Sequence, residues 1–92
     1  MKKMEHTKIV PSLAGVQMSG LKVPMAVVYH NAKDLPGTYS SRLWEATANI
    51  PTNIMITRDT LKEIREDIKK AGFKTKFPAG AGEDRVIVET WI

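Results

Sequence analysis

The amino-acid sequence predicts an α+β fold, a single small domain in which a mixed or antiparallel sheet carries its helices on one face. Three features point to this class. Residues 57–92 contain a capped helix, a glycine stop and two β-rich runs. Apolar and polar residues upstream alternate at the period of a strand. The chain of 92 residues is long enough for one modest core and too short for two domains.

Residues 1–7 are polar enough to form a flexible tail, which leaves residues 8–92 for the folded domain. Ile9 and Val10 come directly before Pro11. Because proline has no N–H to donate to a sheet, this pair predicts at most a short strand.

A β-hairpin is expected next, with residues 13–18 and 21–29 as its two arms. Ser19 and Gly20 between the arms can form a two-residue turn, because glycine adopts positive φ without a steric cost. Pro24 in the second arm favours an edge position or a bulge.

The middle of the chain contains a predicted turn and an ambiguous element. Pro36 and Gly37 occupy the second and third positions of a type II turn over residues 35–38. Residues 40–49 favour a short helix with a serine cap, although an irregular strand fits the same window. The residues at the helical spacing are Leu43, Trp44, Thr47 and Ile50.

A short buried strand is predicted over residues 52–57, with Ile54 and Ile56 on one face and Met55 on the other. It leads directly into the most clearly marked helix. Thr60 and Glu63 have the spacing of a capping box, in which the threonine hydroxyl accepts from the amide three residues on.

Apolar residues on one face extend this helix to about residue 71, and Gly72 stands where a left-handed residue ends a helix. The apolar positions are Leu61, Ile64, Ile68 and Ala71. We expect this face to pack on the sheet.

Residues 73–77 and 85–92 predict two strands that pair as an antiparallel hairpin. Alternation places Lys74 and Lys76 on the face of the first strand that points away from the core. The expected order of elements is therefore β-β-α-β-α-β-β.

The composition is that of a soluble globular protein, with 42% hydrophobic and 26% charged residues. No apolar run approaches the roughly 20 residues that span a bilayer, so no membrane association is expected. The basic start of the chain resembles a signal-peptide n-region, but Pro11 and Gly15 interrupt the apolar stretch that would have to follow. The absence of cysteine excludes disulfides and thiolate chemistry and fits the cytoplasm.

No local pattern predicts an enzyme, a metal site or a cofactor. His6 and His30 are the only histidines, and neither lies at helical spacing from another metal-ligating residue. His30 could act as a general base, with Asp34, Glu45 or Glu83 as its partner, but an exposed histidine at a strand end is the commoner outcome.

The one basic cluster lies around the end of the predicted helix, and the net charge is +4. Its members are Lys69, Lys70, Lys74 and Lys76. Cations near a helix C-terminus interact favourably with the helix dipole, and lysines on an edge strand oppose aggregation. The alternative is that the cluster binds nucleic-acid phosphates, with Lys62 and Arg65 as further contacts.

Aromatic residues in so small a domain belong mostly in the core, but Trp91, next to the last residue, is the best candidate for exposure. We therefore expect a small regulatory or accessory protein that binds another protein, or a second copy of itself as a homodimer. The candidate interface residues are Trp91 and Tyr29, and nucleic-acid binding is the alternative function.

Overall fold

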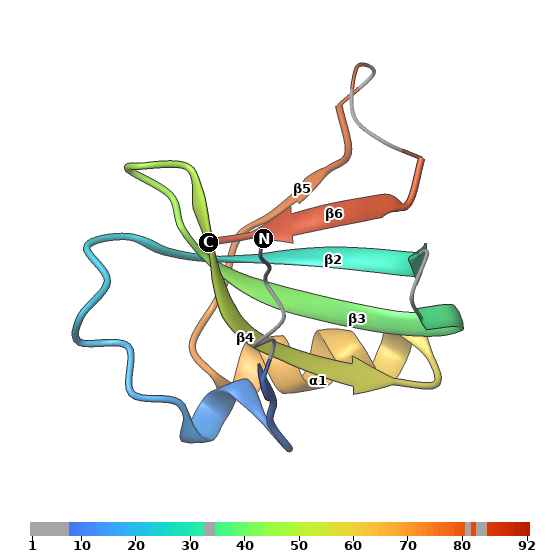
Figure 1. Cartoon of the computed structure of the whole chain (residues 1–92), viewed down its shortest axis with the longest axis horizontal. Helices are drawn as coiled ribbons and strands as arrows, with labels where there is room; N and C mark the ends of the chain where they lie inside the picture. The colour runs from blue at the N-terminus through green and yellow to red at the C-terminus, as the bar shows by residue number, and fades with distance from the viewer. Residues whose placement is uncertain (1–7, 33–34, 81, 83–84) are drawn as a thin grey trace, which may run out of the picture.

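The computed structural model describes residues 8–32, 35–80, 82 and 85–92. The predicted α+β class and the single domain are confirmed (Figure 1). The predicted tail, residues 1–7, lies outside the described residues. In chain order the elements are β1 (Lys8–Ile9), η1 (Leu13–Gly15, one turn of 3₁₀ helix), β2 (Pro24–Ala32), β3 (Leu35–Glu45), β4 (Ile50–Arg58), α1 (Leu61–Lys70), β5 (Lys76–Pro78) and β6 (Ile87–Trp91).

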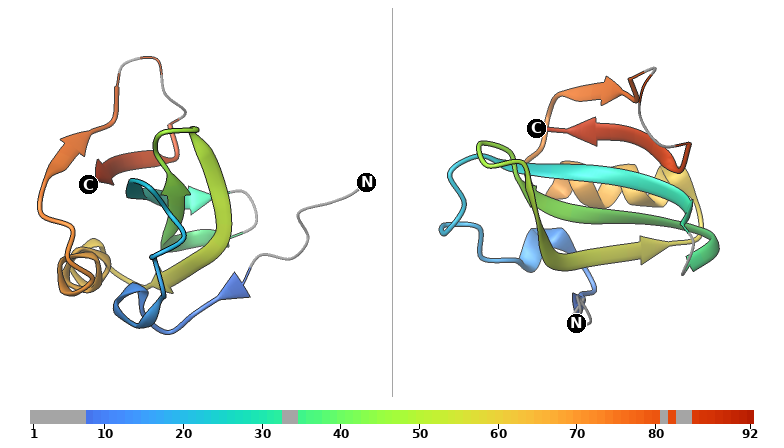
Figure 2. Two further views of the ribbon diagram at one scale, coloured as in Figure 1. Left: turned by 90° about the vertical axis from the view of Figure 1, so that its left-hand side faces the viewer. Right: turned by 45° about the horizontal axis from the view of Figure 1, so that its top comes forward.

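The six strands within the described residues belong to one mixed sheet with the spatial order β1-β4-β3-β2-β6-β5. Strand β1 is parallel to β4, and every other neighbouring pair is antiparallel. Figure 2 shows α1 and η1 side by side on one face of the sheet, and the two elements contact each other. The helix-bearing face is therefore covered by two segments that are far apart in the sequence.

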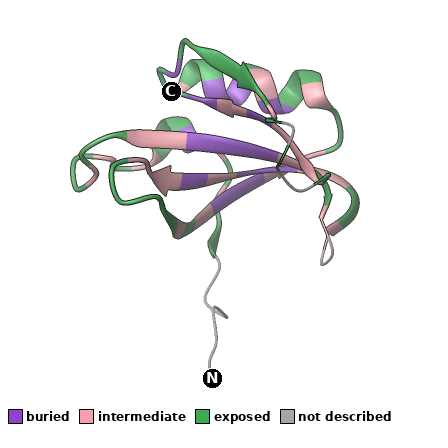
Figure 3. Cartoon of the chain, turned by 90° about the horizontal axis from the view of Figure 1, so that it is seen from above, coloured by how far each residue is buried: buried purple, intermediate pink, exposed green. Residues whose placement is uncertain are grey.

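The core fills the space between the sheet and these helices, and the buried residues concentrate along the middle of the strands (Figure 3). Ala26 on β2 lies opposite both Leu43 on β3 and Trp91 on β6, which places one row of core side chains across three strands. The buried core residues are Leu13, Ala26, Val28, Leu43, Ile56, Ile64, Ile68, Phe73 and Trp91.

Helix α1 begins and ends where its sequence signals predict. The Thr60 hydroxyl accepts a hydrogen bond from the Glu63 amide at 3.2 Å and donates one to the Glu63 carboxylate at 3.0 Å. Gly72 ends the helix with a φ of +104°, a conformation that other residues rarely adopt. Ile64 and Ile68 are buried, as the apolar face predicts. In the described part of the chain, no helix has the length and apolar character needed to cross a bilayer.

The predicted hairpin over residues 13–29 is wrong. Ser19 and Gly20 do form a turn, but the first arm contains η1 and an irregular segment, and β2 pairs with β3 and β6 instead. Leu13 is fully buried beside α1, so burying one apolar side chain outweighs the local preference for a strand. Pro24 is the first residue of β2, a strand inside the sheet rather than at its edge.

The favoured helix over residues 40–49 is also wrong, because β3 continues to Glu45. Strand β3 lies between β2 and β4, and both neighbours supply backbone partners. In a helix Leu43 and Trp44 would share a face, whereas in the strand Leu43 enters the core and Trp44 lies on the opposite face. The predicted turn at residues 35–38 also falls inside β3, where Gly37 has the expected positive φ of +75° at an irregularity of the ladder.

The predicted antiparallel pairing of the two C-terminal strands is confirmed, with Phe77 opposite Thr90. Strand β5, however, starts only at Lys76, so Phe73 is buried in the core while Phe77 is exposed. Lys76 lies opposite Trp91 and therefore on the helix-bearing face, which corrects the prediction that it points away from the core.

Candidate functional site

Trp91 is not a surface residue: its exposed fraction is 4%, so the prediction of an exposed tryptophan is wrong. Its strand, β6, lies between β2 and β5, and the indole Nε1 donates a hydrogen bond to Glu89 Oε2 at 2.8 Å. A residue near the end of the sequence can still occupy the interior of a sheet, because strand order is set by tertiary pairing.

Tyr29 is half-buried on the sheet face opposite α1. The Trp44 indole donates a hydrogen bond to its hydroxyl at 3.2 Å. On the same face Val27 and Met55 are only 5% and 6% exposed. Because these apolar side chains are already shielded from water, a partner would gain little by covering them.

His30 stacks on Tyr39, with ring centroids 4.1 Å apart and an interplanar angle of 11°. Within the described residues its imidazole makes no hydrogen bond to a carboxylate. Glu45, one of its candidate partners, lies at the far end of β3 and binds other groups. Asp34 and Glu83 lie outside the described residues. In the described part of the chain, no three metal-ligating side chains are grouped closely enough to hold a metal ion.

The four lysines of the predicted basic cluster are all exposed, but they do not form one group. Lys70 lines a cleft of about 180 Å³ together with acidic residues of α1. The other residues of that cleft are Arg58, Glu63, Glu66 and Asp67. Lys69 belongs to the opposite flank of α1, Lys74 to the connection after the helix, and Lys76 to β5.

Arg65 and Glu89 join α1 to β6 through two hydrogen bonds of 2.7 and 3.0 Å. Burial raises the pKa of the Glu89 carboxyl, but the hydrogen bonds from Arg65 and Trp91 outweigh burial and hold this pKa below its ordinary value. The same bond raises the pKa of Arg65. This guanidinium is therefore largely committed to holding the helix on the sheet.

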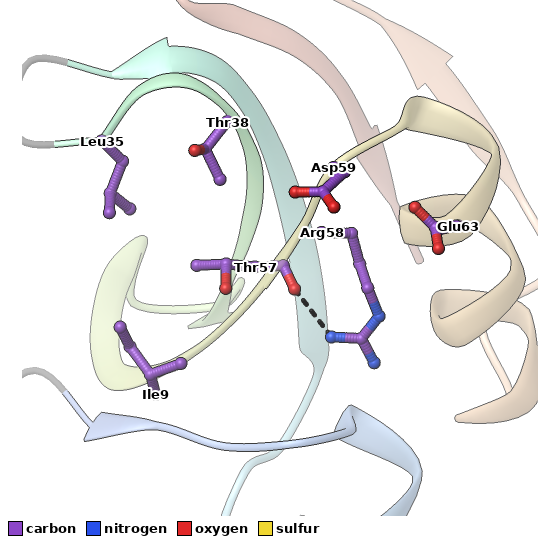
Figure 4. A pocket seen from close by; sticks show the side chains of 7 residues that line it. All are labelled: Ile9, Leu35, Thr38, Thr57, Arg58, Asp59 and Glu63. Carbon is purple, nitrogen blue, oxygen red and sulfur yellow. Dashed lines mark hydrogen bonds between the residues drawn. The ribbon is translucent and has the colours of Figure 1, made fainter.

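A cleft of about 340 Å³ lies beside the start of α1 (Figure 4). Its lining residues are Ile9, Leu35, Thr38, Thr57, Arg58, Asp59 and Glu63. The Arg58 guanidinium donates to the carbonyl oxygen of Thr57 on its own strand, to that of Pro11 and to Asp67 on α1. The remaining charges of the cleft are acidic, and the one guanidinium is engaged within the fold.

A different hollow lies where α1 ends and β2 begins, with a volume of about 250 Å³. We call it the apolar groove, and its lining residues are Met18, Lys22, Val23, Pro24, Ala71, Gly72, Phe73 and Ile92. Val23 and Ile92 are 36% and 47% exposed, although both are large apolar residues. The sequence pattern did not indicate this site, because its residues come from three separate segments of the chain.

Glu45 holds one wall of the apolar groove in place. Its carboxylate accepts hydrogen bonds from the backbone amides of Lys22 at 2.6 Å and Val23 at 3.2 Å. It also accepts from the hydroxyl and the amide of Thr47. These four hydrogen bonds, the Thr47 hydroxyl first among them, lower the pKa of Glu45 to about 2. The wall therefore depends on an ionised carboxylate at the end of β3.

Comparison of the chain with models of known protein families, with curated proteins and with solved structures found no match.

Proposed function

We propose that this protein is a non-catalytic regulatory or accessory protein that binds a short apolar segment of another protein in the apolar groove. The observation that carries this proposal is the exposure of Val23 and Ile92 at an apolar hollow. Removing such surface from water yields about 25 cal/mol per Å². A partner that covers the groove would gain this free energy.

The size of the groove indicates what kind of group enters it. A volume of about 250 Å³ suits one or two anchoring side chains rather than a drug-sized ligand, since small-molecule pockets are commonly about 300–1,000 Å³. Most of the lining is apolar, and the Lys22 side chain provides a polar contact. A second copy of the chain could supply such an anchor as well, which would produce a homodimer.

A binding role is also supported by the state of the polar side chains. The carboxylates of Glu45, Asp67 and Glu89 each accept several hydrogen bonds within the fold. A general base needs a free lone pair directed at its substrate. The lack of cysteine fits a reducing compartment, so the cytoplasm is the proposed location.

A peptide library displayed on phage tests the proposal. We expect the wild-type protein to enrich peptides with apolar anchor residues and Val23→Gln to lose them, because a polar side chain would then enter the groove. Ile50→Gln is the matched control: Ile50 is 56% exposed at the start of β4 and does not line the groove. This variant should retain the wild-type peptides.

Sedimentation velocity on the same three proteins tests for the homodimer. Self-association that disappears in Val23→Gln and persists in Ile50→Gln would identify a second copy as the occupant. The proposal is wrong if no peptide is enriched and the protein remains monomeric, or if Val23→Gln binds as well as the wild type.

A further inference from the structure

Helix α1 carries a run of basic residues on one flank and its acidic residues, together with Lys70, on the other. Lys62, Arg65 and Lys69 recur at intervals of three and four residues and share one flank. Because Arg65 reaches Glu89 on β6, this flank is turned toward β6 and its neighbour β5. The other flank carries the acidic residues that line the 180 Å³ cleft.

Lys76 on β5 extends the basic flank across to the sheet. It lies opposite Trp91, on the sheet face that also carries Glu89. Lys76 is thus a diagonal neighbour of Glu89 across the β5–β6 pair, and its positive charge adds to the lowering of the Glu89 pKa. Helix and strand together therefore form a basic strip, which we define as Lys62, Arg65, Lys69 and Lys76.

The strip carries more positive than negative charge. Arg65 pairs with Glu89 and Lys76 also acts on that carboxylate, while Lys62 and Lys69 form no ion pair with any described residue and have the exposed Glu66 as their acidic neighbour on the helix. Phe77, the residue after Lys76, is 47% exposed but lies on the other face of β5, so the strip has no apolar centre. Protein interfaces usually have an apolar centre, so the strip is better suited to a polyanion than to a protein surface.

We infer that the basic strip binds the phosphate backbone of nucleic acid, at a surface separate from the apolar groove. The spacing of the lysines supports this partner. At 1.5 Å of rise per residue, Lys62 and Lys69 lie about 10 Å apart along α1. This length corresponds to about three nucleotides of one strand along the axis of a duplex, at roughly 3.4 Å each, so the lysines of the strip can reach phosphates of the same backbone. Lysine binds phosphate as a point charge, which favours affinity without base specificity.

Fluorescence anisotropy with a labelled single-stranded oligonucleotide and a labelled duplex tests this inference over a series of salt concentrations. Three phosphate contacts predict that the logarithm of the association constant falls with the logarithm of salt at a slope of roughly −2 to −3. The test variant is Lys69→Glu with Lys76→Glu. The matched control is Lys70→Glu with Lys8→Glu, because each pair combines one lysine of the last helical turn with one lysine of an edge strand.

Both double variants change the net charge equally, and thermal unfolding checks that both remain folded. We expect the test variant to bind either nucleic acid more than about tenfold more weakly than the wild type, and the control to stay within about threefold, since only the first loses direct phosphate contacts. Equal losses in the two variants, or no wild-type binding at low salt, would overturn the inference. Poly-glutamate at an equal concentration of charges should not displace the oligonucleotide. Displacement would overturn the inference and indicate an acidic protein as the partner.

Discussion

At the scale of single residues, three carboxylates connect segments that are distant in sequence. Glu45 binds the amides of Lys22 and Val23, Asp67 binds Ser12 and Leu13, and Glu89 binds Arg65. Asp67 and Glu89 accept from buried donors that would otherwise lose their hydrogen bonds on folding, whereas the amides that Glu45 binds are exposed. Removing one of them is therefore expected to release a segment as well as a charge.

Glu45 should make stability depend on pH. Its pKa is about 2 in the folded protein against an ordinary value of 4.5, so its contribution is complete above about 4.5 and is lost as the pH falls from 4.5 towards 2. We expect the wild type to have a larger free energy of unfolding than Glu45→Gln at neutral pH. This difference should disappear as the pH approaches about 2. Urea denaturation across this range measures it.

Glu66→Gln is the control for this experiment, because it removes the same charge from an exposed position without removing the hydrogen bonds to Lys22 and Val23. Glu66→Gln should therefore not show the loss of stability at neutral pH that is expected of Glu45→Gln. A constant difference between the wild type and Glu45→Gln over the whole range would contradict the role assigned to this carboxylate.

At the scale of elements, α1 and β3 show how far local pattern determines structure. Helix α1 has a cap, an apolar face and a glycine stop that agree with one another, and it forms where they predict. The local pattern of β3 does not agree with its structure, since the spacing of its apolar residues fits a helix. The chain becomes a strand there because two neighbouring strands supply its backbone partners.

Ile68→Ala should destabilise the protein by about 2–5 kcal/mol, because it removes a fully buried side chain and leaves a cavity between α1 and the sheet. The free energy of unfolding from urea titration provides the measurement. Glu66→Ala, on the exposed side of the same helix, should change stability by less than about 0.5 kcal/mol. Equal effects of the two substitutions would contradict the packing of this face.

At the scale of the whole molecule, the segment before β2 is fastened to the domain through Asp67. This buried carboxylate accepts from the Ser12 hydroxyl at 2.6 Å and the Leu13 amide at 2.9 Å, and pairs with Arg58 at 3.2 Å. Leu13 completes the core beneath it. The segment before β2 is thus held against α1 on one face of the sheet.

Asp67→Asn preserves the size of the side chain but removes its charge and one acceptor oxygen. We expect a loss of about 1–3 kcal/mol, as for a buried hydrogen-bonded group left partly unsatisfied. Hydrogen exchange of the Leu13 amide should accelerate more than that of Ile64, because the segment would detach before the helix unfolds. Uniform acceleration at both amides would show that Asp67 acts on global stability alone.

The basic strip can be predicted in part from the sequence, whereas the apolar groove cannot. Lys69 and Lys76 stand out as charges, and Lys62 and Arg65 follow from helical spacing, but only the pairing of β5 with β6 brings Lys76 to the helical flank. The groove has no local signature at all. Its lining joins residues near 20 and 72 with Ile92, and hydrophobic periodicity carries no information about such contacts.

The sequence by itself determined the fold class, the limits of α1, the faces of β4 and the pairing of the last two strands. These features depend on hydrogen bonds and apolar contacts between residues close in sequence, where caps, glycine and periodicity act directly. Only the tertiary structure decided that residues 40–45 form a strand, that Trp91 is buried and that Leu13 enters the core. The reason is that burial and ladder pairing are shared between distant segments, and their free energy exceeds the propensities that a local window records.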